Sequence, residues 1–216
     1  MDFRRNVLFG VFLVLTMLPS CSNNFGDGQD RVAVTTSVED SPYELEIRLF
    51  RLPERLRHLN HFTYSLKMGK DGFLYLGVGD NADNGNLLRF DPATERITNL
   101  GDFRSALPAK IRDEGNYGKV HVGPHQTNDG SVYFASYTRE HWGGDQVGRL
   151  FRYRESEGIV DLGPTPNNQG VYFMHGDDVH NRLYLANHDS HFAIYDITSG
   201  SWEDKGRFSS KPPFIG

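Results

Sequence analysis

Short apolar segments separated by turns run through the chain from residue 62 onward, and one segment recurs three times. In each copy a turn leads into a strand that carries a tyrosine at the same place, Tyr75, Tyr133 or Tyr184. The copies are spaced by roughly 50 to 60 residues. The pattern predicts three units of four strands each, joined by hairpin-length turns, at residues 62–101, 119–163 and 171–208.

The second strand of each unit is apolar on both of its faces. In the first unit Tyr75 points to one side while Leu74 and Leu76 point to the other, and residues 132–134 and 183–185 repeat this pattern. A strand that is apolar on both faces is buried on both. Because the connections are too short to supply covering helices, the solution is a stack of small antiparallel sheets. We therefore expect an all-β fold, a β-propeller of four-stranded antiparallel blades.

Three such blades form an incomplete ring, since propellers have four to eight. Residues 209–216 are predicted to start a further, truncated blade. The second unit should begin with a strand at residues 119–125, and residues 31–61 are expected to hold N-terminal strands and a short helix that starts at Pro53.

The N-terminus has the pattern of an export signal. An apolar run of about 12 residues, 7–18, follows a short charged start and is too short to span a bilayer of about 30 Å. Residues 1–20 are predicted to be a signal peptide, and residues 21–30 a polar tether. The sequence Leu-Pro-Ser-Cys ending at Cys21 resembles a bacterial lipobox, which implies lipidation of Cys21 and a membrane anchor in the cell envelope, periplasmic or at the cell surface. The alternatives are an uncleaved anchor or an ordinary signal with a free thiol.

Charge and cysteine content exclude two classes of protein. The net charge is −5 and no run of Lys and Arg occurs, so we expect no nucleic-acid partner. A single cysteine excludes a disulfide framework within the chain.

Two segments carry a family resemblance. Residues 88–101, Leu-Arg-Phe-Asp-Pro-Ala-Thr-Glu-Arg-Ile-Thr-Asn-Leu-Gly, resemble the third and fourth strands of a propeller blade, and residues 193–202 are similar to the Kelch form of that piece. Asn187 and His188 stand where Kelch blades have a glycine pair. The chain thus resembles Kelch-like, streptogramin-lyase-like or NHL-like propellers, which implies a fold and no particular activity.

In propellers, ligands bind at the loops that follow the second strands, and the innermost strands line the central channel. On this chain the loop after Tyr137 is the longest and mixes charged and aromatic side chains that suit a sugar or another polar ring. The resemblance implies that the ligand-binding candidates are Arg139, His141, Trp142, His188 and Asp189.

Histidines on the inner strands allow a second interpretation. His121, His125 and Tyr137 are candidate catalytic residues of a polysaccharide lyase, in which a base removes a proton, an acid protonates the leaving oxygen and a divalent metal or Arg139 neutralises a uronate carboxylate. These histidines would otherwise donate to backbone or face solvent, because no local metal-binding spacing is present. Two functions follow: an envelope module that binds a carbohydrate or protein ligand, or an enzyme acting on carbohydrate.

Overall fold

The computed structural model describes residues 31–37, 44–50, 52, 54–56, 65–79, 85–112, 119–137, 147–168, 170–187 and 190–210. The predicted signal peptide and tether lie outside the described residues, as do residues 211–216 of the predicted last partial blade. The chain divides into two compact units, Met1–His58 and Leu59–Gly216. In the first unit β1 (Arg31–Ser37) pairs antiparallel with β2 (Glu44–Phe50), and a short 3-10 helix, η1, covers Glu54–Leu56.

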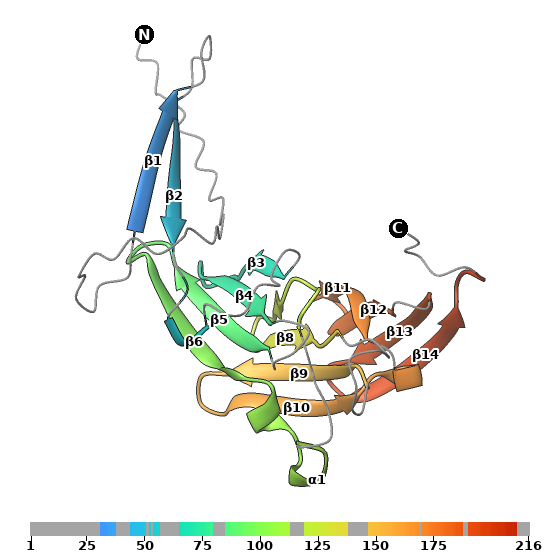
Figure 1. The fold of residues 1–216 in the computed structure, drawn as a ribbon. Coiled ribbons are helices and arrows are strands. Elements are labelled where there is room, and N and C mark those ends of the chain that lie inside the picture. Colours follow the sequence, from blue (N-terminus) through green and yellow to red (C-terminus); the bar gives the residue numbers. More distant parts are fainter. Residues whose placement is uncertain are drawn as a thin grey trace. The chain divides into compact units, whose positions relative to one another are not determined.

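Within the described residues, the second unit contains three four-stranded antiparallel sheets (Figure 1). The first sheet is β3 (Leu66–Met68), β4 (Leu74–Val78), β5 (Asn86–Asp91) and β6 (Arg96–Asp102). The second sheet is β7 (His125–Gln126), β8 (Val132–Ala135), β9 (Arg149–Arg154) and β10 (Gly158–Pro164). The third sheet is β11 (Val171–Asp177), β12 (Arg182–Asn187), β13 (His191–Asp196) and β14 (Ser201–Arg207).

Strands follow one another in chain order in each sheet, and the three described sheets do not close into a barrel. The predicted all-β fold with four-stranded antiparallel blades is confirmed, and the arrangement is that of an incomplete propeller. Among the described residues, three short helical segments connect one sheet to the next along the chain: η2 (Arg104–Ala106), α1 (Ala109–Arg112) and η4 (Pro166–Asn168).

The turn between the first and second strands is built the same way in all three sheets. Gly72 and Gly130 adopt a φ of 83°, and Asn181 takes the corresponding place with a φ of 52°. Glycine and asparagine accept this left-handed backbone at the lowest cost. An aspartate next to each turn accepts hydrogen bonds from turn N–H groups; in the second sheet Asp129 accepts one from Ser131 at 3.1 Å.

Aromatic side chains form the core between the first two sheets. The Phe134 ring lies 5.1 Å from that of Phe103 and 5.4 Å from that of Phe151, and none of the three is exposed. The repeated tyrosines are part of the same packing, because Tyr75 and Tyr133 are only 3% exposed. Burial of these large aromatic side chains supplies the main driving force for stacking the sheets.

Glycines allow neighbouring sheets to approach closely. A Cβ on Gly77 would lie 2.5 Å from Cβ of Val120, and a Cβ on Gly176 would lie 2.1 Å from the His125 ring. Both distances are far below van der Waals contact. The first and second sheets therefore meet at Gly77, and the second and third sheets meet at Gly176.

A search of the described residues finds no helix that is long and apolar enough to cross a membrane.

Candidate functional site

The candidate site forms at Tyr137, two residues after the end of β8. The Tyr137 N–H donates to the carbonyl of Lys119 at 2.7 Å, and the two residues form an isolated β-bridge. Two residues beyond Lys119, the imidazole of His121 stacks on the Tyr137 ring with 4.1 Å between centroids and 28° between planes. The structure thus brings together two of the three predicted catalytic residues.

Tyr172 of β11 adds a third ring from the neighbouring sheet. Its centroid lies 5.1 Å from that of His121 and 5.3 Å from that of Tyr137, the latter contact being edge-on. A backbone hydrogen bond from Val171 to the carbonyl of Ser136 (3.1 Å) fixes the two sheets to each other at this point. We call His121, Tyr137 and Tyr172 the three-ring cluster.

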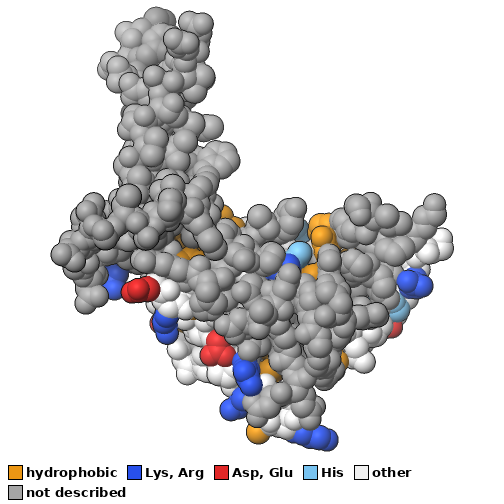
Figure 2. All heavy atoms as spheres, viewed as in Figure 1, with side chains coloured by type: hydrophobic (Ala, Val, Ile, Leu, Met, Phe, Trp, Pro, Cys, Tyr) orange, Lys and Arg blue, Asp and Glu red, His pale blue; other side chains and the backbone are white. Residues whose placement is uncertain are grey.

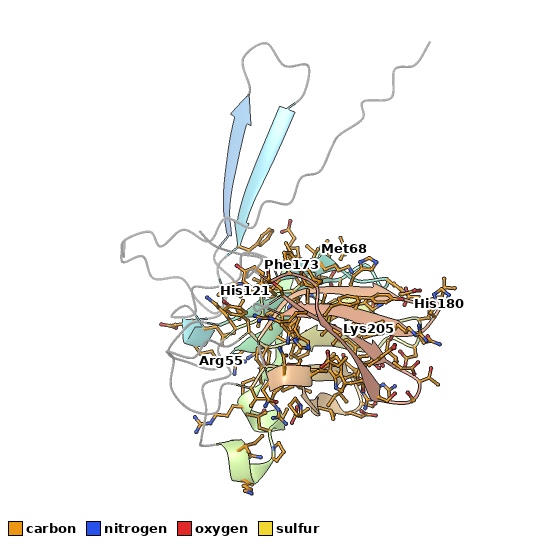
Figure 3. All side chains as sticks on the ribbon, turned by 90° about the vertical axis from the view of Figure 1, so that its right-hand side faces the viewer. Arg55, Met68, His121, Phe173, His180 and Lys205 are labelled. Atoms are coloured by element: carbon orange, nitrogen blue, oxygen red, sulfur yellow. The ribbon has the colours of Figure 1, made fainter. Side chains whose placement is uncertain are left out.

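The three-ring cluster has a buried and an accessible side. Tyr137 is completely buried, whereas His121 and Tyr172 are each partly exposed. Phe173, which follows Tyr172, lies 5.5 Å from its ring and is 54% exposed. Figure 3 shows the labelled His121 and Phe173 near each other, and both rings contact Tyr172. Figure 2 shows histidine, cationic and hydrophobic side chains close together on one part of the described surface.

Lys119 gives the three-ring cluster a positive charge. Its ammonium lies 5.8 Å from the centre of the Tyr137 ring, and the residue is 7% exposed. A cation at this distance from an aromatic face is attracted by the ring quadrupole, more strongly where water is excluded. The site therefore combines aromatic faces, an imidazole, tyrosine hydroxyls and a nearby cation.

His125 is the third predicted catalytic residue, and it lies apart from the three-ring cluster. It is in β7, nearer the turn that joins β7 to β8, and it faces the third sheet. It pairs with Tyr133 in the register of β7 and β8, and its ring rests against Gly176. Its Nε2 lies 3.2 Å from Oδ1 of Asp178, whose Oδ2 accepts a hydrogen bond from Lys70 at 2.6 Å. The predicted trio therefore does not meet at one point.

Charge balance at His125 follows from this geometry. Burial lowers the pKa of the His125 imidazole, and the hydrogen bond to Asp178 offsets the effect only in part. Partial burial would raise the pKa of Asp178, but hydrogen bonds from Lys70 and His125 outweigh it and hold that pKa below its usual value. Asp178 is consequently a stable carboxylate, with its two oxygens used for contacts between sheets.

The remaining predicted site residues lie outside the described residues: Arg139, His141, Trp142, His188, Asp189 and Cys21. Their roles stay predictions. Among the described residues no group of three or more His, Cys, Asp or Glu side chains gathers in a way that could hold a metal ion.

Sequence reasoning missed Lys119 and Tyr172 as site residues. Both residues lie near the start of a predicted unit. The sequence pattern gives the residue type at such a position, but it does not give the residue that contacts it from the neighbouring sheet. The signal that would have found Tyr172 is its position at the beginning of the third unit, directly after the loop that joins two blades.

No family model and no curated protein sequence matches the chain. Solved structures do resemble it. A virginiamycin B lyase from Staphylococcus aureus matches over 82% of this chain and 50% of its own, with 14% identity and a TM-score of 0.47. A structure described as a 6-phosphogluconolactonase of Bacteroides uniformis matches over 82% and 48%, with 16% identity and a TM-score of 0.43.

A structure described as the Dos1 propeller matches over 83% of this chain and 44% of its own, with 10% identity and a TM-score of 0.49. The chain thus spans half or less of the length of these structures. At such identities the likeness concerns the path of the backbone and says nothing of activity. The chain is similar to propeller proteins in its three stacked four-stranded sheets.

Proposed function

We propose that this chain belongs to a β-propeller binding module of the cell envelope, whose ligand contacts the three-ring cluster. The observation that carries the proposal is the position of His121 and Tyr172. The two residues belong to neighbouring sheets, their ring centroids are 5.1 Å apart, and both side chains are partly exposed. Ligand sites are concave, largely apolar and aromatic, with a few polar groups that orient the ligand.

The chemistry of the three-ring cluster suits a sugar ring. Aromatic faces pack on the C–H groups of such a ring, while the imidazole and the Tyr172 hydroxyl offer hydrogen bonds to its hydroxyls. The ammonium of Lys119 near the Tyr137 ring favours a ligand with a carboxylate over a neutral one. An acidic oligosaccharide is therefore the ligand class that the described residues favour.

Binding is favoured over catalysis by the burial of Tyr137. An acid that protonates a leaving oxygen must come within hydrogen-bond reach of it, and Tyr137 has no exposed surface. Tyr137 is packed beneath His121, where it supports the two partly exposed rings of the cluster. The lyase alternative would have to use His121 with Tyr172.

Attachment to the envelope is the second part of the proposal. The lipobox-like sequence that ends at Cys21 supports export followed by lipidation of that cysteine. A lipid there would hold the module at a membrane surface, where polysaccharide or protein ligands are encountered.

The test is a titration of the purified protein with oligogalacturonate, and with neutral gluco-oligosaccharide for comparison, by isothermal calorimetry. His121→Ala and Tyr172→Ala should each weaken binding of the acidic oligomer by tenfold or more. The matched control is His180→Ala, because His180 lies far from His121 on an exposed turn (Figure 3).

Binding that is unchanged in both cluster variants would refute the proposal. A lyase would form unsaturated uronate, which absorbs ultraviolet light, during the titration. If this product forms and its formation is lost in His121→Ala, the lyase hypothesis replaces the binding hypothesis.

A further inference from the structure

The first strand of each described sheet forms one edge of that sheet. In the second sheet this strand is β7, and the irregular residues 119–124 lead into it. β7 lies against β11, and in a propeller the edges of the first strands line the central channel. We call residues 119–126 the inner segment. Because the channel stays open in a closed ring, a ligand can reach the inner segment from there.

Lys67 of β3 lies along the inner segment at Gly123. A Cβ on Gly123 would be 3.4 Å from Cβ and 3.5 Å from Cδ of Lys67, so the aliphatic chain of the lysine lies against bare backbone. Gly123 follows His121 by two residues, which is no more than about 7 Å of chain. Lys119 precedes His121 by the same number of residues. Two lysines therefore flank the histidine of the three-ring cluster, one on each side along the inner segment.

The two lysines differ in their surroundings. Lys119 is buried beside the Tyr137 ring. Lys67 is only partly buried, and within the described part of the chain its ammonium has no carboxylate partner. Burial lowers the pKa of the His125 imidazole, and the charge of Lys67 adds to this effect. A partly buried ammonium without a counter-charge is costly to the free protein, and a bound carboxylate would offset that cost.

The carboxylates at the turns of the first and third sheets already bind other groups of the protein. Asp178 contacts Lys70 and His125. Asp71 accepts hydrogen bonds from two neighbouring side chains. The inner segment, β3 and β11 up to residue 176 contain no Asp or Glu. The inner edges of the described sheets are therefore cationic, and Lys67 is placed to bind an anion that comes from outside the protein.

We propose that Lys67 forms a second carboxylate-binding subsite, so that the ligand of the three-ring cluster is a polyuronate with at least two acidic sugars. This inference rests on the function proposed above and adds the length of the ligand to it. An oligomer along the inner segment places one sugar on the rings of His121 and Tyr172 and a further sugar at Gly123. Lys119 and Gly123 are four residues apart, about 13 Å in extended chain, which is more than one sugar ring spans. A monosaccharide would thus reach only one of the two lysines.

The test compares ligands of different length on the same purified protein by isothermal calorimetry. In the wild type, affinity should rise from galacturonate through digalacturonate to tetragalacturonate. Lys67→Met keeps the aliphatic chain and removes the charge. It should weaken binding of the tetramer about tenfold, the cost of one charged contact, and leave binding of the monomer unchanged. Lys67→Arg should restore most of the affinity for the tetramer.

The matched control is Lys70→Met, because Lys70 belongs to the same sheet but already pairs with Asp178. This variant should bind all three ligands as the wild type does. Added salt should weaken tetramer binding less in Lys67→Met than in Lys70→Met, because one ion pair fewer is screened.

A wild type that binds galacturonate as tightly as the tetramer would overturn the second subsite, and this comparison holds even if Lys67→Met does not fold. Unchanged tetramer binding in Lys67→Met, or equal losses for monomer and tetramer, would also overturn it. In each of these cases the three-ring cluster remains the binding site as long as His121→Ala weakens binding. Failure of the proposed function itself looks different, because no galacturonate ligand would then bind the wild type.

Discussion

The Asp178 carboxylate joins Lys70 of the first sheet to His125 of the second, at 2.6 and 3.2 Å, although Asp178 itself belongs to the third. Lys70 also donates to Asn128 of the second sheet at 2.6 Å. The turns of all three sheets are therefore held together at one end of the stack. The three-ring cluster forms at the opposite end of β8, so the two ends have different roles.

Removal of the Lys70 contact should cost little stability. Lys70 and Asp178 keep 40% and 30% of their side-chain surface exposed, and pairs of this kind are worth about 0.5 to 1 kcal/mol because solvent screens them. Lys70→Met should lower the free energy of unfolding in urea by that amount. An unchanged midpoint would show that the turns are held by the apolar contacts alone.

Stability should depend on pH through His125. Its folded-state pKa is lowered by burial, so the unfolded chain binds a proton more readily. Stability due to this group is complete above the unfolded pKa of about 6.5 and falls as the pH drops below that value. His125→Gln should therefore show a flatter loss of stability than the wild type between about pH 7 and 5.

The matched control for that experiment is Asn128→Ala, which removes a neutral partner of Lys70 and leaves His125 in place. It should keep the wild-type slope of unfolding free energy against pH. Equal slopes in the wild type and His125→Gln would contradict the assignment.

The close approach at Gly176 should make that position intolerant of a methyl group. A Cβ there would lie 2.1 Å from the buried His125 ring, so Gly176→Ala should destabilise the fold by about 1 to 3 kcal/mol. Gly123→Ala, where the nearest atom is 3.4 Å away, should change the melting temperature little. Comparable losses in the two variants would mean that the contact with His125 is not the cause.

Much of the fold could be predicted from local pattern. The apolar strands with a tyrosine at a fixed place, as at Tyr75 and Tyr133, predicted stacked four-stranded sheets, because burial on both faces leaves few other solutions. The first strand of the second sheet is shorter than predicted and covers only His125–Gln126. Pro124 has no N–H to donate to a ladder and Gly123 weakens a strand, which explains the loss of residues 119–124 from it.

The candidate site was less predictable, because it depends on register between segments far apart in sequence. The stack of His121 on Tyr137 requires the bridge at Lys119, and a shift of one residue would turn the ring to the other side. Tyr172 joins the site through packing between sheets, which one sequence does not specify. His125 is four residues from His121, yet contacts with Asp178 and Gly176 place it in another environment.

Core and exposed phenylalanines should differ sharply in their effect on stability. Phe134 is fully buried against Phe103 and Phe151, so Phe134→Ala should cost about 3 to 5 kcal/mol. Phe208 is 59% exposed, and Phe208→Ala should cost less than about 1 kcal/mol. Urea unfolding followed by circular dichroism measures both, and a small loss for Phe134→Ala would place the core elsewhere.

Lipidation is tested apart from the fold. Cys21→Ser should abolish incorporation of radiolabelled palmitate when the protein is expressed in a bacterium, since the chain contains no other cysteine. The variant should also leave the membrane fraction, unless the apolar residues 7–18 stay attached as an anchor. Labelling that persists in Cys21→Ser would refute the lipobox interpretation.

The buried pair of Arg149 and Asp161 offers the sharpest test of how the second sheet is held. Arg149 donates to Asp161 from Nε and Nη2, the shortest contact being 2.6 Å, and the two side chains are only 9% and 6% exposed. Removal of one partner leaves a buried charge without compensation, so Asp161→Leu should destabilise the fold by about 3 kcal/mol or more. Replacement of both groups removes the unpaired charge, so Arg149→Met with Asp161→Leu should recover most of that loss. Unfolding free energies of the two single variants and the double variant form a complete cycle, and additive losses would show that the pair is not coupled.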